Sequence, residues 1–225
     1  MILALDSSQS AGSIAILNDG KLLYSAYFDI RITHSETLMP AIDFAFQLSR
    51  LDKRELKAIY VCLGPGSFTG LRIGIASAKG IAFALKLPVY GYNSLEMLAL
   101  NCLPTAGKIL VVNDAKMQEC YAALYDERLG ELQTPEMLSP AEILNWDISG
   151  AIVSGSAMQL FTPYQKDYHL DFAPPWQNIP RAEALYYLQE YKAPQIWQPE
   201  TLKELEPFYL RDSTAQIKAR QRQKR

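Results

Sequence analysis

The sequence has few of the residues that build metal centres and disulfide frameworks. Its 225 residues include three cysteines and two histidines. Cys62, Cys102 and Cys120 form no C-x-x-C pair, so we expect reduced, packed thiols in a reducing compartment. His34 and His169 lie far apart in the chain and belong to no H-x-x-x-H motif. We therefore predict that the protein holds no metal.

Long apolar runs are also missing. The most apolar window, residues 73–89, is interrupted by Lys79, Lys86 and Pro88, and no uninterrupted run approaches the length of a membrane span. Residues 1–5 are strand-like and no basic region precedes an apolar one, so we expect no signal peptide. We predict a cytoplasmic protein that does not associate with membranes.

Charge is nearly balanced overall but unevenly distributed. The chain carries a net charge of −2, and residues 211–225 hold six basic side chains and one acid, a net of +5. The other 210 residues therefore sum to −7, which does not favour a nucleic-acid platform on the body of the protein. We interpret residues 211–225 as a basic, solvated, mobile tail, and leave open its contact with a phosphate backbone.

Hydrophobic periodicity predicts an α/β protein. Residues 2–6, 13–17 and 21–28 are typical of a three-stranded antiparallel meander, with a turn at Asn18-Asp19-Gly20. Thr33 and Glu36 fit a capping box at the start of a helix that runs to about Arg50. The further expected elements are a strand at 59–63, a helix at 70–87, a strand at 89–92, a helix from Ser94, a hairpin over 108–125, a strand at 151–154 and a helix at 181–191. Two similar halves indicate two lobes, over residues 1–103 and 104–210.

Residues 64–74, Gly-Pro-Gly-Ser-Phe-Thr-Gly-Leu-Arg-Ile-Gly, join an apolar strand to an apolar helix and are named the glycine loop here. The start of a helix suits an anion because its free N–H groups and its dipole favour negative charge. The spacing fits neither a P-loop, nor a dinucleotide fingerprint, nor a nucleophile elbow. Asp6-Ser7-Ser8 and Asn113-Asp114-Ala115 end the first strand of each half, either as phosphate-facing groups or as polar turns. The candidate anion- or nucleotide-proximal residues are Asp6, Ser8, Gly64, Gly66, Ser67 and Arg72.

The two long helices offer a candidate interaction surface. Small residues recur every four positions along the second helix, and apolar residues of the first lie on more than one side. Such faces pack either against the chain's own sheet or against another subunit. The candidate interface residues are His34, Glu36, Leu38, Ile42, Ala45, Gly70, Leu71, Gly74, Ala78 and Ala82.

Several segments together resemble the bacterial TsaB (YeaZ) family. They are Ile2–Ser8, His34–Pro40, Gly64–Gly74, Val112–Tyr121 and Pro207–Arg211, so the resemblance covers nearly the whole chain. It implies a two-lobed actin/Hsp70/sugar-kinase-like (ASKHA) fold, with a mixed sheet and flanking helices in each lobe. Lys116 departs from the family's Asp-Ala-Arg pattern in the second lobe.

The resemblance also implies a function: a non-catalytic subunit of the complex that makes N6-threonylcarbamoyladenosine in tRNA. The chain would bind the catalytic paralogue TsaD, and TsaE with it, through helices 35–50 and 70–87, and form a homodimer through the same helices when alone. Asn93 and Leu98 stand where the paralogue's metal-binding histidines would be. We expect no intrinsic cofactor, weak nucleotide binding at most, and tRNA contact only indirectly or through the tail. The alternative is an ATP-dependent phosphotransferase of the sugar-kinase type that uses Asp6 and Asp114.

Overall fold

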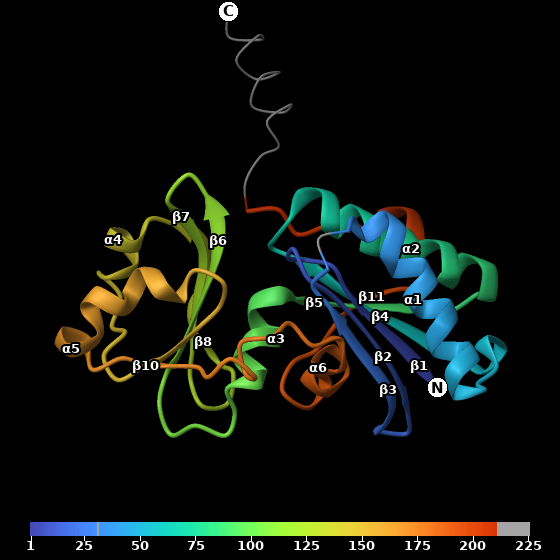
Figure 1. Ribbon diagram of the computed structural model, residues 1–225, viewed down its shortest axis with the longest axis horizontal. Helices are drawn as coiled ribbons and strands as arrows, with labels where there is room; N and C mark the ends of the chain where they lie inside the picture. The colour runs from blue at the N-terminus through green and yellow to red at the C-terminus, as the bar shows by residue number, and fades with distance from the viewer. Residues whose placement is uncertain (31, 211–225) are drawn as a thin grey trace, which may run out of the picture.

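The computed structural model describes residues 1–30 and 32–210, and the basic tail at 211–225 lies outside the described residues. Two lobes lie side by side (Figure 1), each built on a mixed sheet. The first sheet has six strands in the order β11-β5-β4-β1-β2-β3, and the second has five in the order β10-β9-β6-β7-β8. The predicted two-lobed α/β fold is confirmed.

The first lobe begins with the predicted meander. β1 (Ile2–Asp6), β2 (Gly12–Asn18) and β3 (Lys21–Phe28) pair antiparallel. β4 (Ala58–Gly64) and β5 (Val89–Asn93) then add in parallel on the other side of β1. β1 and β4 are nearly continuous runs of buried apolar residues, as expected of central strands that are covered on both faces.

Helices cover both faces of this sheet. α1 (His34–Ser49) and α2 (Phe68–Leu85) lie together on one face, and α3 (Ser94–Asn101) and α6 (Ala182–Tyr187) on the other (Figure 1). The 3₁₀ turn η1 (Lys53–Glu55) connects α1 to β4. The predicted capping box at Thr33 is wrong, because the Thr33 hydroxyl bonds the Ser35 hydroxyl and caps no helix N–H.

Among the described helices, α2 has the length and apolar composition of a membrane span. It also carries Arg72 and Lys79 and packs one face on the first sheet, as core helices of globular proteins do. The localisation stays a prediction.

The second lobe repeats the order of the first with shorter helices. Its elements are β6 (Ile109–Lys116), β7 (Glu119–Tyr125), β8 (Glu131–Leu138), α4 (Pro140–Ile143), β9 (Ile152–Ser154), η2 (Met158–Tyr164), α5 (Gln165–Tyr168) and β10 (Asp171–Phe172). β6 is the central strand, antiparallel to β7 and parallel to β9.

The C-terminal part of the predicted second lobe, 104–210, returns to the first lobe. β11 (Gln195–Trp197) pairs with β5, and Leu185 and Leu188 join the core beneath the first sheet. The 3₁₀ turns η3 (Leu188–Glu190) and η4 (Leu202–Glu204) flank β11. Apolar residues of α6 favour this return, because α6 packs on β1, β2 and β4 of the first sheet.

Candidate functional site

The interlobe cleft, a cavity of about 520 Å³, lies where the central strands of both lobes end. Four chain segments line it: the β1–β2 turn, the N-terminal end of α2 with the loop before it, the hairpin of β6 and β7, and the turn after β9. The lining residues are Ser8, Gln9, Ser10, Gly66, Ser67, Phe68, Asn113, Asp114, Ala115, Lys116, Tyr121 and Ser156. The structure therefore brings the two predicted strand ends and part of the glycine loop to one place.

The β1–β2 turn lies directly under the start of α2. The Ser7 hydroxyl donates to the Gly70 carbonyl at 2.8 Å, and the Ser67 N–H donates to the Ser8 carbonyl at 2.7 Å. A Cβ at Gly66 or Gly70 would lie 2.1 Å from the carbonyl oxygen of Ser8 or Ser7, respectively. A Cβ at Gly74 would lie 2.2 Å from the Ser7 hydroxyl oxygen. The glycines of α2 thus permit close packing within this chain.

This packing corrects most of the predicted interface. Nine of its ten residues are buried inside the chain: His34, Leu38, Ile42, Ala45, Gly70, Leu71, Gly74, Ala78 and Ala82. They fill the space between the helices and the first sheet, so a partner cannot reach them. Glu36 alone is exposed. His34 is held inside by a 2.8 Å hydrogen bond from its Nε2 to the Gln9 carbonyl.

Other large apolar side chains of the same helices are exposed. Phe44 is 55% exposed, Leu48 61% and Phe83 76%, and Met39 is exposed as well. Phe44 and Leu48 are four residues apart and therefore share one side of α1. Both sides of each helix are apolar in the sequence, so the pattern alone did not distinguish the outer side from the inner one.

Asp6 lies behind the cleft. Its Oδ1 accepts the Ser8 N–H at 3.1 Å, and its buried Oδ2 has no hydrogen-bond partner. Burial raises the pKa of this carboxyl above its ordinary value, against smaller lowering effects from Ser8, Cys62 and His34. Because Asp6 is 1% exposed, its side chain does not reach a ligand in the cleft as the structure stands.

Asn113 occupies the corresponding position in β6, three residues before that strand ends. Its Oδ1 accepts the Ser156 N–H at 3.1 Å and the Gln9 Nε2–H at 3.3 Å. The second bond joins the two lobes across the cleft. Gln9 and Ser156 lie in ordinary polar turns, and no sequence motif distinguished them.

Asp114 is the other acid named for a phosphotransferase. It is exposed and forms a 2.5 Å ion pair with Lys116, and the hydrogen bond from Lys116 lowers the pKa of its carboxyl. Asp6 and Asp114 therefore differ in accessibility, in partners and in the direction in which their pKa values are shifted.

The remaining predicted anion-binding residues do not form one set. Ser8, Gly66 and Ser67 line the cleft, but Gly64 and Arg72 do not. The Ser67 hydroxyl caps α2 by accepting the Gly70 N–H at 3.2 Å. The Arg72 guanidinium stacks on the Phe68 ring at 3.8 Å, and its Nε donates to the Tyr209 hydroxyl at 3.1 Å. The N–H groups of Ser67 and Gly70, at the start of α2, are thus already hydrogen-bonded within the protein.

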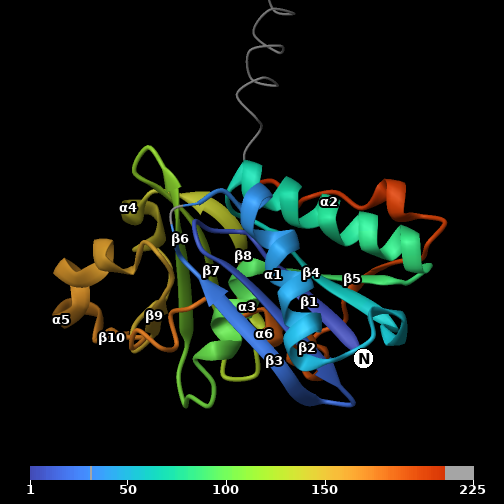
Figure 2. The ribbon, with the colours of Figure 1, turned by 45° about the vertical axis from the view of Figure 1, so that its right-hand side comes forward.

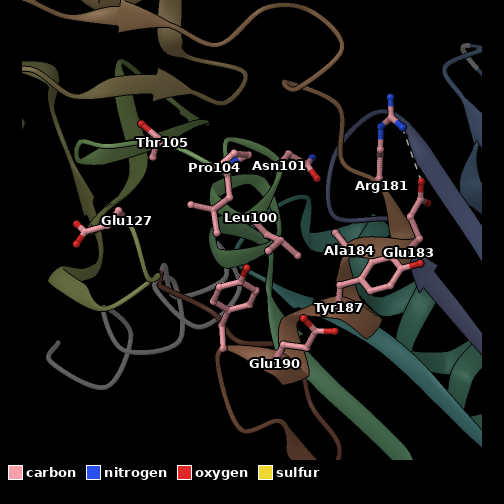
Figure 3. Close-up of a pocket in the computed structure, with 12 residues that line it drawn as sticks. Leu100, Asn101, Pro104, Thr105, Glu127, Arg181, Glu183, Ala184, Tyr187 and Glu190 are labelled. Atoms are coloured by element: carbon pink, nitrogen blue, oxygen red, sulfur yellow. Dashed lines mark ion pairs between the residues drawn. The ribbon is translucent and has the colours of Figure 1, made fainter. Parts of the chain in front are cut away.

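In the described part of the chain, no group of three histidine, cysteine or acidic side chains is placed to hold a metal. Asn93 and Glu96 form the capping box of α3, and Glu96 also pairs with Lys192 at 3.0 Å. A second cavity of about 510 Å³ lies between α3 and α6 (Figure 3). Its polar side chains include Glu127, Arg181 and Glu190, and it contains no residue predicted for the site.

The fold and the cleft define a class: a two-lobed α/β protein with a polar cleft between its lobes. Residues 30–219 match the TsaD family, described as tRNA N6-adenosine threonylcarbamoyltransferase. The solved structure titled YeaZ from Pseudomonas aeruginosa superposes with a TM-score of 0.73 at 27% identity, over 93% of this chain and 99% of that one.

Relatives named tRNA threonylcarbamoyladenosine biosynthesis protein TsaB align as well. The Haemophilus influenzae protein is 29% identical over 228 residues, 94% of this chain and 93% of its own length. The Bacillus subtilis protein is 34% identical over 132 residues, 59% of this chain and 58% of its own length. The Escherichia coli match, 35% identical, covers 55% of this chain and 54% of that protein. The chain belongs to the TsaD family, among its TsaB (YeaZ) members.

Proposed function

We propose that the chain acts in the biosynthesis of N6-threonylcarbamoyladenosine in tRNA as a non-catalytic subunit. It binds the catalytic paralogue TsaD through the outer side of α1 and α2, and TsaE joins through that complex. The names of its TsaB relatives support the pathway. The observation that carries the subunit role is the exposure of four large apolar side chains on α1 and α2.

The outer side of α1 and α2 has the chemistry of a protein interface. Phe44, Leu48 and Phe83 are each more than half exposed, and Met39 is 46% exposed. Figure 1 shows α1 and α2 side by side on the outside of the first lobe. Single exposed apolar residues are ordinary, but four on two adjacent helices favour a docking surface. Glu36, at the start of α1, adds a charged group at its edge.

The non-catalytic role is supported by the state of the two acids. A sugar-kinase-type reaction needs carboxylates that reach a nucleotide and its metal ion. Asp6 is buried behind the cleft, and Asp114 is engaged with Lys116. The β1–β2 turn directs its carbonyls toward α1 and α2, where Ser67 and His34 bond them.

Binding to purified TsaD tests the proposal. Phe44→Asp and Leu48→Asp are expected to weaken the complex at least tenfold in calorimetry, because each places a charge in an apolar contact. Leu160→Asp is the matched control, since Leu160 is 47% exposed on η2 in the second lobe. Unchanged affinity in both α1 variants would contradict the interface.

Reconstitution of the tRNA modification tests the role in the pathway separately from the proposed binding surface. With the other components fixed, omission of this chain is expected to abolish product, and the α1 variants are expected to need a higher concentration for the same rate. For the phosphotransferase alternative, calorimetry with Mg-ATP is the measurement. Micromolar binding, with hydrolysis lost in Asp6→Ala, would favour that alternative.

A further inference from the structure

The cavity between α3 and α6, called the hinge cavity here, lies where the chain crosses between the lobes. Figure 1 shows α3 and α6 side by side between the two sheets, and Figure 2 shows the same pair from a second direction. Residues 102–108 lead from α3 to β6, and residues 173–181 lead back from β10 to α6. Leu103 and Pro104 of the first crossing and Arg181 of the second line the cavity. Its volume of about 510 Å³ is in the range of pockets that hold small molecules.

The charged side chains that line the hinge cavity have a net negative charge. Three are carboxylates, Glu127, Glu183 and Glu190, and one is the guanidinium of Arg181. Glu183 lies 3.9 Å from Arg181 and accepts the Ser25 hydroxyl at 2.9 Å, so its carboxylate already has partners. Among the described residues, Glu127 and Glu190 form no ion pair. Two carboxylates of the cavity therefore lack a cation.

Apolar side chains lie between the acidic sides of the hinge cavity. Figure 3 shows Glu127 on one side, Glu183 and Glu190 on the other, and Leu100 with Pro104 between them. Glu127 belongs to the turn between β7 and β8 of the second lobe, whereas Glu190 belongs to η3, which packs on the first lobe. The cavity therefore has a carboxylate from each lobe and an apolar stretch between the two.

This arrangement fits a linear aliphatic chain that carries an ammonium group at each end. Carboxylates bind ammonium groups through charge-assisted hydrogen bonds, and apolar side chains bind the methylene groups between them. Tyr187 and Tyr191 also line the cavity, and the face of an aromatic ring attracts a cation. The net negative charge disfavours a phosphate or a nucleotide at this place.

We propose that the hinge cavity binds an aliphatic diamine or polyamine, with one ammonium group at Glu127 of the second lobe and another at Glu190 beside the first. The bound amine connects the two lobes at the point where the chain crosses between them. The site lies on the opposite face of the first sheet from α1 and α2, so it does not depend on the proposed function.

Titration of the full-length chain with spermidine in a calorimeter tests the proposal. Glu127→Gln and Glu190→Gln keep the size of the side chain and remove one charge each. Each is expected to weaken binding about threefold, the effect of one exposed ion pair, and the double variant about tenfold. Glu200→Gln removes the same charge from an exposed position outside the cavity and is expected to have no effect. Triethylene glycol, an uncharged chain of similar length, is expected not to bind.

Methyl NMR identifies the place of binding. The methyl resonances of Leu100, Leu103 and Ala184, which line the hinge cavity, are expected to shift as spermidine is added. Those of Leu160, which is exposed on η2 of the second lobe, are expected to stay unchanged. Methyl shifts that spare the three cavity residues would overturn the proposal.

Two calorimetric results would overturn it as well. One is the absence of binding at about 10 mM spermidine and low ionic strength, where a weak ion-pair site is detectable. The other is a double variant that binds spermidine as tightly as the wild type. TsaD binding, measured separately, is expected to persist in Glu127→Gln and Glu190→Gln, so failure of the amine site is distinguishable from failure of the proposed function.

Discussion

Both lobes contain the same connection, called the joint here, in which a glycine with positive φ stands at the end of β4 or directly after β9. The lobes differ in the helices that follow this joint. In the first lobe, β4 ends at Gly64, with φ of 101°, and the next loop bonds the β1–β2 turn through the Ser67 N–H, which donates to the Ser8 carbonyl. In the second, Gly155 follows β9 with φ of 110°, and the Ala157 N–H bonds the carbonyl of Val112 within β6. Both joints favour glycine, because each has a positive φ and a Cβ would lie 2.7 Å from Leu71 Cδ1 at Gly64 and 2.1 Å from the Val112 carbonyl oxygen at Gly155.

Beyond the joint the lobes diverge. α2 has 18 residues, whereas η2, at the same place in the second lobe, has seven. α1 has 16 residues and its counterpart α4 has four. The joint is therefore a property of the architecture, and the long helices are a property of the first lobe alone. This difference supports placing the proposed TsaD contact on α1 and α2.

The largest expected effect tests the joint itself. Gly155→Ala combines a left-handed backbone with a Cβ 2.1 Å from the Val112 carbonyl oxygen, and should lower the free energy of unfolding by about 3 kcal/mol. Gly70→Ala, with a Cβ 2.1 Å from the Ser7 carbonyl oxygen, should cost a similar amount in the first lobe. Urea unfolding measures both.

Gly150→Ala is the control for backbone conformation. Gly150 has φ of 73°, and a Cβ there meets no atom within 4 Å, so the cost should be about 1 kcal/mol. If Gly155→Ala costs no more than this control, the short distance from the added Cβ to the Val112 carbonyl oxygen does not explain why position 155 is glycine.

Much of the fold followed from the sequence, because strand and helix periods are local properties. The meander, β4, β5 and the hairpin of β6 and β7 were predicted near their observed positions. The return of β11 to the first sheet was not, because a three-residue strand has no period and its pairing is decided by the packing of α6. The strand ends were named as either phosphate-facing groups or polar turns, and the sequence did not predict that the two would meet in a cleft. The inner and outer sides of α1 and α2 were exchanged.

The second prediction concerns the ion pairs that hold the lobes together. Lys192 pairs with Glu96 of the first lobe at 3.0 Å and with Glu131 of the second at 2.8 Å, and its ammonium lies 5.2 Å from the Tyr125 ring centre. Lys192→Met leaves two partly buried carboxylates without a cation and should cost about 2–3 kcal/mol in urea unfolding.

Lys53→Met is the matched control for this lysine. Lys53 pairs with Asp43 where both side chains are half exposed, so the change should stay within about 0.5 kcal/mol. Equal effects of the two substitutions would show that the interlobe ion pairs contribute no more than a surface pair.

The third prediction concerns Asp6→Asn, a substitution that makes the first lobe resemble the second at one residue. Asp6 in β1 and Asn113 in β6 occupy corresponding positions of the central strands, so Asp6→Asn gives both strands the same side chain there. The pKa of Asp6 is raised in the folded protein, so the folded state holds its proton to higher pH than the unfolded state. Wild-type stability from this group is therefore present at low pH and falls as pH rises from about 3.8 through the folded pKa.

The Asp6→Asn variant lacks this titration and keeps an oxygen that can accept the Ser8 N–H. At pH 7 its Tm should exceed the wild-type value by about 2–4 °C, the shift produced by one kcal/mol in a chain of this size. The difference should shrink toward pH 4 in thermal unfolding followed by circular dichroism. A variant less stable than the wild type at pH 7 would mean that the ionised carboxylate is stabilised by groups other than the Ser8 N–H.

The smallest expected effect separates stability from binding on α2. Gly70 and Gly74 face the β1–β2 turn, but a Cβ at Gly80 meets nothing within 4 Å. Glycine inside a helix costs stability relative to alanine, so Gly80→Ala should stabilise the free chain by about 0.5–1 kcal/mol. If TsaD docks on the outer side of α2, the added methyl group lies in the contact and weakens the complex while the free chain becomes more stable. Opposite signs in urea unfolding and in TsaD calorimetry would place the partner against Gly80, and a gain in stability with unchanged affinity would move the contact away from this part of α2.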